Sequence, residues 1–308
     1  MSLSAARLFH VNVNCSDLER SRRFYTEGLG LELGARTAPE ETQSGAAFGL
    51  ARARWDASIL LGPRGYDGGA IDLLEWHEPA PAGAPPTRLF ETGFQRLGVR
   101  VPDLDAAIAR VGALGGCVWS EPFGHALVDG GEIRLVLAGD PDGTAIELIE
   151  GGPSTVSFVA ITCADLERSR SFYRSLGFRE IAQYPSDNPD GSHLRIDGPV
   201  AMDEVVLAAP DEHDKHDEVL VMLVGFRAPR CEAAAPRAAN TIGMWRAAFL
   251  VADLDDAVAE LARLRVDTIS APVTMSMGPN LPNLPTLRFV CFRGPDDEVL
   301  ELIEQPAS

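Results

Sequence analysis

The sequence has few cysteines, and they follow no pattern that binds a metal or builds a disulfide framework. Five occur among 308 residues, at positions 15, 117, 163, 231 and 291, and none belongs to a Cys-x-x-Cys pair. A zinc knuckle needs closely spaced thiolates, and a disulfide-stabilised domain needs a dense, even set. Both classes are excluded, and this cysteine usage is typical of the reducing cytoplasm.

Positive charge and long apolar runs are also scarce. The chain carries 27 Lys and Arg against 45 Asp and Glu, a formal net charge of -18 at pH 7. A field of this sign repels phosphate backbones and anionic membranes, so we expect no nucleic acid and no membrane partner. No stretch approaches the roughly 18 apolar residues of a membrane-spanning helix, and residues 1–8 lack the apolar core of a signal peptide. We expect a cytoplasmic protein, a monomer or a homodimer, whose partner is a small molecule.

One segment of the chain occurs twice. Residues Cys15–Tyr25 return as Cys163–Tyr173, with nine of eleven positions identical. A match of this length indicates a tandem duplication. A fainter echo lies inside each half, where Asp103-Leu104 and Asp253-Leu254 repeat the Asp-Leu pair of the longer segment. The chain therefore consists of four modules, which begin near residues 8, 95, 156 and 245.

Each module is predicted to contain a strand, a helix that begins at the Asp-Leu pair, and three further strands. In the first strand, alternation predicts Leu8 and His10 on one face and Phe9 on the other. The helix is predicted to begin at Asp17, or at Ser16 with a capping box. Pro- and Ala-rich segments at 79–86 and 229–236 join the modules of each half. The predicted domains are 1–150, with modules 1–85 and 86–150, and 155–308, with modules 155–235 and 236–308.

This organisation resembles the vicinal oxygen chelate superfamily, the group of glyoxalase I, bleomycin resistance proteins and extradiol dioxygenases. The resemblance covers nearly the whole chain and rests on Phe-His-Val-Asn-Val at 9–13, Asp-Leu-Glu-Arg-Ser at 17–21 and Asp-Pro-Asp-Gly at 140–143. It implies an α+β fold in which four βαβββ modules pair into two open barrels, each with a ligand cavity. The repeats do not show which modules pair, so in-order and crosswise pairing both stay open.

The resemblance also implies a divalent metal in the cavity of an open barrel, which we also call a cup. Side chains from the first and last strands of each module would hold this metal. Carried onto this sequence, the ligands are His10, Asp72 and Glu147, and Glu147 is also the candidate catalytic base. The fourth position is Arg96, which cannot ligate a cation because it stays protonated and has no free lone pair. A metal such as Fe, Mn, Ni or Zn is therefore expected with an incomplete ligand set.

The second half departs further from the family pattern. Its equivalent positions are Phe158, Met222, Arg246 and Glu301, so a metal is expected in the first domain only. Crosswise pairing would instead gather His10, Asp72, Arg246 and Glu301. Arg and Glu are retained in both halves, which favours two ion pairs, Arg96 with Glu147 and Arg246 with Glu301. Alternatively, Arg96 or Arg246 binds a carboxylate or phenolate of a ligand.

Other polar and aromatic residues are weaker candidates. Trp76 is predicted to contact the ligand or to belong to the core, and His125 lies in a loop that borders the cavity in the family. His213 and His216 belong to a charged run that indicates a surface loop, and residues 140–143 are predicted to form a turn without a further role.

Two functions follow from the resemblance. The first is a protein similar to bleomycin resistance proteins, which binds a small organic molecule in a barrel cavity with a degenerate metal site. The second is a metal-dependent lyase, isomerase or dioxygenase, in which a metal near His10 and Glu147 polarises a substrate oxygen.

Overall fold

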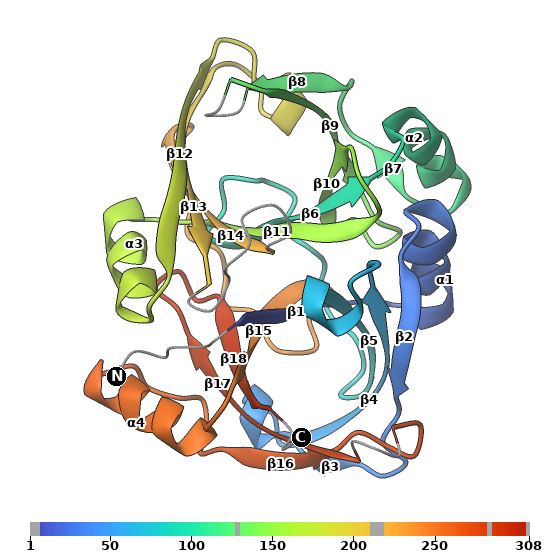
Figure 1. The fold of residues 1–308 in the computed structure, drawn as a ribbon, viewed down its shortest axis with the longest axis vertical. Coiled ribbons are helices and arrows are strands. Elements are labelled where there is room, and N and C mark those ends of the chain that lie inside the picture. The colour runs from blue at the N-terminus through green and yellow to red at the C-terminus, as the bar shows by residue number, and fades with distance from the viewer. Residues whose placement is uncertain (1–6, 127–129, 210–218, 282–284, 306–308) are drawn as a thin grey trace.

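The computed structural model describes residues 7–126, 130–209, 219–281 and 285–305, which form two curved sheets of nine strands each (Figure 1). The first sheet has the order β16-β17-β18-β15-β1-β5-β4-β2, and β3 pairs with β4. Its strands are β1 (Arg7–Asn14), β2 (Glu32–Thr37), β3 (Gln43–Ser44), β4 (Arg52–Leu61), β5 (Ala70–Glu78), β15 (Gly243–Val251), β16 (Val273–Ser276), β17 (Thr286–Arg293) and β18 (Val299–Glu304).

The second sheet has the order β12-β13-β14-β11-β6-β10-β9-β7, and β8 pairs with β9. Its strands are β6 (Gly93–Val101), β7 (Cys117–Val118), β8 (Phe123–Ala126), β9 (Glu132–Gly139), β10 (Ala145–Glu150), β11 (Thr155–Thr162), β12 (Arg179–Asn188), β13 (Val200–Ala208) and β14 (Leu220–Ala228). The α+β fold class of four modules in two cups is confirmed.

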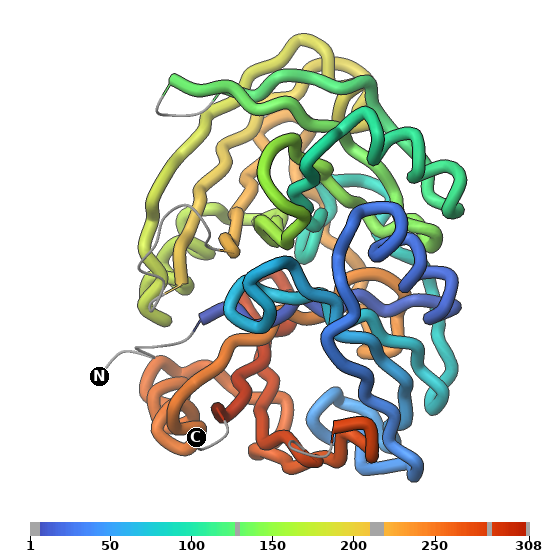
Figure 2. Tube along the Cα trace, turned by 45° about the vertical axis from the view of Figure 1, so that its right-hand side comes forward, coloured from blue at the N-terminus to red at the C-terminus, as the bar shows by residue number. Residues whose placement is uncertain are grey.

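The modules pair crosswise. Strands β1 and β15 run antiparallel at the centre of the first sheet, and β6 and β11 do so in the second. Each sheet thus takes one module from each half of the chain, which Figure 2 shows as blue with orange-red in one cup and green with yellow in the other. We call the sheet of modules one and four the first cup, and the sheet of modules two and three the second cup. The two sheets therefore do not coincide with the halves 1–150 and 155–308.

Each of the four longer helices begins directly after an Asp N-cap. The helices are α1 (Leu18–Arg23), α2 (Leu104–Ala113), α3 (Leu166–Ser175) and α4 (Leu254–Arg263), with short turns at Phe24–Gly28, Ala46–Phe48, Gly65–Gly68 and Ser192–Leu194. The carboxylates of Asp17, Asp103, Asp165 and Asp253 accept the backbone N–H three residues on. The Asp-Leu pairs are therefore helix starts, and Asp17, not Ser16, is the first cap. Among the helices described, none is long and apolar enough to span a membrane.

A bulge in the first strand of each half changes which side chains share a face. The pairing of β1 with β15 shifts between Leu8 and His10, and β11 shifts at the equivalent place. A bulge inserts one residue, so the alternation restarts after it. Leu8 consequently joins Val11 in the core between the sheets, and Phe9 lines the same cavity as His10. The prediction that Leu8 shares a face with His10 is wrong for this reason.

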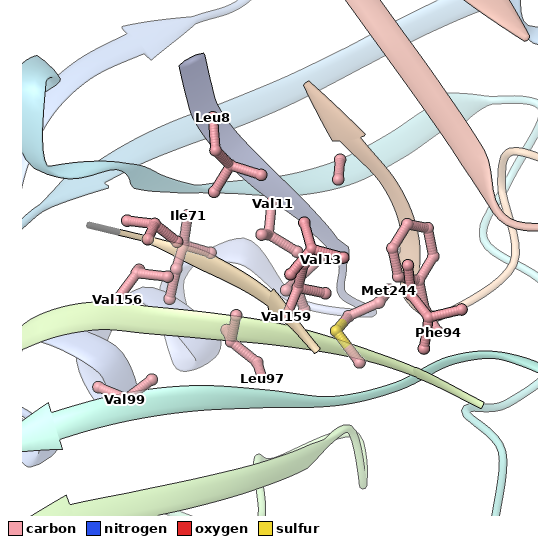
Figure 3. Packing of buried hydrophobic residues seen from close by; sticks show 14 of the residues in the cluster. Leu8, Val11, Val13, Ile71, Phe94, Leu97, Val99, Val156, Val159 and Met244 are labelled. Atoms are coloured by element: carbon pink, nitrogen blue, oxygen red, sulfur yellow. The ribbon is translucent and has the colours of Figure 1, made fainter. Parts of the chain in front are cut away.

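The two sheets pack against each other through a continuous apolar core. Figure 3 shows part of this core, in which Leu8, Val11 and Val13 of β1 belong to the same cluster as Val159 of β11 and Leu97 of β6. All five side chains are at most 1% exposed, so this core joins both cups along the central strands. The opposite face of each sheet is left free for a cup interior.

A tyrosine and an acid connect the two modules of each half. The Tyr25 hydroxyl donates to Asp140 at 3.0 Å, and the Tyr173 hydroxyl donates to Glu298 at 2.9 Å. Burial raises the pKa of Asp140 to about 6 and that of Glu298 to about 7. The turn at 140–143 therefore has a structural role that the sequence prediction missed, because its Asp140 binds Tyr25 in the segment that follows α1.

We expect these acids to make the protein less stable as the pH rises. The folded state binds their protons more tightly than the unfolded chain, where the ordinary pKa values are 4.5 for Glu and 3.8 for Asp. The stabilisation is complete below those values and is lost as pH rises through 6 and 7, at about 3 kcal/mol for each group. The free energy of unfolding in urea should fall between about pH 5 and about pH 8, and a Glu298→Gln variant should lose the part of this fall that Glu298 causes. The exposed control Glu32→Gln should keep the whole fall, and a fall in Glu298→Gln equal to that of the wild type would contradict the expectation.

Candidate functional site

Four polar side chains meet on the inner face of the first cup. They are His10 of β1, Asp72 of β5, Arg246 of β15 and Glu301 of β18, from four neighbouring strands of the sheet. We call them the polar cluster. Each is at most 6% exposed, so the sheet holds two acids, one arginine and one histidine away from water. Crosswise pairing creates this group, because β1 and β5 come from one half of the chain and β15 and β18 from the other.

The Arg246 guanidinium binds both acids of the polar cluster. Its Nε donates to Glu301 Oε2 and its Nη2 donates to Asp72 Oδ2, each at 2.7 Å. Burial alone would lower the pKa of Arg246, but the two carboxylates outweigh it and hold the pKa above its ordinary value. Burial likewise would raise the pKa of Glu301, but the guanidinium and the neighbouring His10 outweigh it and the pKa lies below its ordinary value. The guanidinium and the Glu301 carboxylate therefore stay charged at neutral pH.

Two members of the polar cluster keep unpaired atoms. The third nitrogen of Arg246, Nη1, has no hydrogen-bond partner among the described residues, and neither has either ring nitrogen of His10. The His10 Nε2 atom lies 3.4 Å from Glu301 and 3.8 Å from Asp72 but makes no hydrogen bond to them. Buried polar atoms usually have partners, so these three are candidate ligand contacts.

A cavity of about 480 Å³ adjoins the polar cluster, which forms part of its lining. Its other polar lining residues are few, and its walls are mainly aromatic and aliphatic: Phe9, Phe48, Trp55, Ile59, Tyr66, Leu250, Met277, Leu281, Leu287, Phe289 and Ile303. An apolar cavity with a few converging polar groups is the usual form of a small-molecule site. Met277 and Leu281 lie in the segment that follows β16, of which residues 282–284 lie outside the described ranges.

The second cup has an equivalent but fully paired arginine. Arg96 Nε donates to Glu147 Oε2 at 2.6 Å, Nη2 donates to Glu204 Oε1 at 2.8 Å, and Nη1 donates to Gln95. Phe158 stands where the first cup has His10, and its ring lies 5.5 Å from the guanidinium carbon. Every nitrogen of this guanidinium therefore has a protein partner.

The structure separates two of the predicted metal ligands from the third. His10 and Asp72 belong to the first cup, but Glu147 lies on β10 of the second. The three residues His10, Asp72 and Glu147 are therefore not brought together in one cup, because β10 pairs with β6 and not with the strands of module one. The carboxylate beside His10 is Glu301. Within the described ranges, no group of three or more His, Cys, Asp or Glu side chains is arranged to hold a metal ion.

Two further candidates lie away from the cavity. Trp76 is 1% exposed, packs against Phe48 at 5.6 Å between ring centroids, and donates its Nε1 to Asn14. It belongs to the core and is absent from the cavity lining. His125 lies on β8 of the second cup with its ring 5.4 Å from Tyr184. His213 and His216 fall outside the described residues.

Glu204 and the aromatic residues of the cavity walls were not among the residues predicted from the sequence. Glu204 on β13 is 3% exposed and supplies the second carboxylate that Met222 cannot provide. The signal was the adjacent pair Asp203 and Glu204 at the start of an apolar run, since alternation in a strand turns one of two neighbouring side chains inward. The walls had no such signal, because Phe48 lies in a short turn and Phe289 lies far from it in the chain.

The sequence matches several curated relatives over part of its length. It is 32% identical over 181 residues to the lactoylglutathione lyase GLX1 of Arabidopsis thaliana, covering 56% of this chain and 55% of that protein. It is 29% identical to a probable lactoylglutathione lyase of Vibrio parahaemolyticus, covering 48% of this chain and 93% of that protein. The matching region spans about half the length of the plant relatives.

Solved structures share the arrangement of both cups. Glyoxalase I from Zea mays superposes with a TM-score of 0.66 at 19% identity, covering 98% of this chain and 93% of that chain. A putative dioxygenase from Bacillus subtilis gives 0.61 at 12% identity, covering 100% and 87%. These likenesses show the fold alone. The family model of the Glyoxalase/Bleomycin resistance protein/Dioxygenase superfamily matches residues 7–148 and 155–302, so the chain belongs to this superfamily.

Proposed function

We propose that this protein binds a small organic molecule in the cavity of the first cup, without a metal ion. The observation that carries the proposal is a largely apolar cavity of about 480 Å³ whose lining residues Arg246 and His10 hold three buried nitrogen atoms without a hydrogen-bond partner. Apolar walls supply affinity, and converging polar atoms orient a ligand. Arg246 and His10 are the proposed anchors.

The donor set of the first cup does not fit the divalent metal that the superfamily implies. Arg246 lies between Asp72 and Glu301 and already neutralises one of their two charges. A permanently protonated guanidinium offers no lone pair, and it would repel a divalent ion beside it. In this proposal Arg246 takes the place of the metal ion. The lyase activity in the names of the relatives is therefore not proposed for this chain.

The second cup is proposed to be structural. Its arginine has no free nitrogen, and the apolar cluster of this cup includes Phe158, Met202 and Phe226, all less than 9% exposed. Arg96 and Glu147 are then an internal ion pair, completed by Glu204 and Gln95. Ligand binding is assigned to the first cup only.

The neutral dye Nile red tests the proposal. It should bind the purified protein with a rise in fluorescence, because the apolar walls of the first cup exclude water from the dye. An Ile59→Trp variant should lose this binding, since Ile59 lines the cavity and the larger indole would fill it. A matched variant of the second cup, Val206→Trp, should retain it if folded. Equal dye binding by wild type and Ile59→Trp, with both proteins folded by circular dichroism, would contradict the proposed site.

A further inference from the structure

We infer that the first cup takes a neutral aromatic ligand whose oxygen atom accepts a hydrogen bond from Arg246, an assignment that rests on the proposed function of the same cavity. It follows from a comparison of the two equivalent arginines. In both cups two nitrogens of the guanidinium bind carboxylates. The two arginines therefore differ in what their third nitrogen, Nη1, binds.

The residue before each arginine decides whether its third nitrogen is paired. Gln95 precedes Arg96 and accepts a hydrogen bond from its Nη1. Trp245 precedes Arg246, and an indole cannot accept; its own Nε1 donates to the Arg237 carbonyl at 3.3 Å. Arg246 Nη1 therefore stays without an acceptor among the described residues. A buried N–H without an acceptor costs free energy, which an oxygen atom on a ligand would recover.

His10 lies beside Arg246 and also has nitrogen atoms that a ligand could bind. It approaches Glu301 Oε2, the same oxygen atom that accepts from Arg246, so the two side chains are neighbours. Both ring nitrogens of His10 lack a hydrogen-bond partner among the described residues, whereas the second cup has the apolar Phe158 at the equivalent position. The unpaired atoms of both residues thus occur together, and both residues line the cavity.

The charge of the polar cluster selects a neutral oxygen. Two carboxylates, Asp72 and Glu301, already face the single guanidinium of Arg246. A ligand carboxylate or phosphate would add a further negative charge beside Asp72 and Glu301 in a buried site, where repulsion is strong. A carbonyl or hydroxyl oxygen accepts from Arg246 Nη1 without this penalty.

The cavity walls select an aromatic body. The Phe48 ring lies 6.1 Å from that of Trp55 and 5.6 Å from that of Phe289, and all three line the cavity. Aromatic rings favour stacked or edge-to-face contacts with a second ring system. A volume of about 480 Å³ accommodates a ligand of two fused rings, within the usual size range of small-molecule sites.

Three naphthalene probes of similar shape test the inference by equilibrium dialysis. They are acetylnaphthalene, which has a neutral acceptor, ethylnaphthalene, which has none, and naphthoate, which is anionic. We expect acetylnaphthalene to bind about tenfold more tightly than ethylnaphthalene, because one hydrogen bond to the guanidinium accounts for such a ratio. Naphthoate should bind more weakly than acetylnaphthalene.

An Arg246→Lys variant should remove the advantage of acetylnaphthalene over ethylnaphthalene, since lysine keeps the charge beside both acids but lacks the planar third nitrogen. The same change in the second cup, Arg96→Lys, should alter none of the three affinities. If Arg246→Lys does not fold, His10→Phe should reduce the advantage instead, with Phe158 as the precedent for phenylalanine at this position.

Equal binding of acetylnaphthalene and ethylnaphthalene, or tightest binding of naphthoate, would overturn the ligand class while the proposed function stands. An advantage that survives in Arg246→Lys would overturn the role of Arg246. Failure of all three probes and of Nile red would overturn the proposed function as well.

Discussion

An Arg246→Gln variant should bind a divalent metal ion in stoichiometric amount, whereas the wild type should bind none. The substitution removes the guanidinium and leaves His10, Asp72 and Glu301 with a new amide oxygen on the same face. The His10 Nε2 atom lies 3.4 Å from Glu301 Oε2 and 3.8 Å from Asp72 Oδ2. Ligand atoms around a tetrahedral zinc ion lie roughly 3.4 Å apart, given metal–ligand distances of about 2.0–2.2 Å.

The metal content of the wild type and of the variant is measured after incubation with Fe, Mn, Ni or Zn and dialysis. The same metal should raise the unfolding midpoint of the variant, since a ligand at about 100 times its Kd stabilises by about 2.7 kcal/mol. Arg96→Gln is the matched control, because Phe158 and Met222 stand where the first cup has His10 and Asp72. Stoichiometric metal in the wild type would refute the proposal that Arg246 takes its place, and a metal-free, folded Arg246→Gln protein would count against the cluster as a former metal site.

Replacing Arg96 by methionine should destabilise the protein by about 3–5 kcal/mol, the cost of leaving a buried ion pair without one partner. The change leaves Glu147 and Glu204 facing each other without a cation, and both are at most 7% exposed. The shift is measured as the change in the urea midpoint at neutral pH.

The triple variant Arg96→Met, Glu147→Leu, Glu204→Leu should recover most of this loss. Apolar replacement of a buried ion pair is often neutral or stabilising, because it removes the cost of desolvating the charges. Nile red should still bind the triple variant, since the cavity belongs to the first cup. A triple variant as unstable as the single one would show that Arg96 acts through its packing against Phe158 rather than through its charge.

Local patterns in the sequence were enough to predict the modules. The Asp-Leu pairs set the helix starts because an Asp cap acts within three residues, and the repeated segment showed that this unit recurs. Local patterns could not predict which side chains of β1 share a face of the sheet. The bulge between Leu8 and His10 depends on pairing with β15, which comes from the other end of the chain. Glu204 was missed because its partner Arg96 lies 108 residues away.

The sequence by itself determined the superfamily, the four modules, and the retention of one arginine and one glutamate in each half. Only the tertiary structure decided which residues share a cup. Crosswise pairing of β1 with β15 puts Asp72 and His10 beside Arg246 and Glu301, and moves Glu147 into the other sheet. The physical reason is that strands pair through backbone hydrogen bonds, which form in the same way between segments that are near or far apart in the sequence. Four similar modules therefore allow three ways of pairing, and the packing of the whole chain selects that of one with four and two with three.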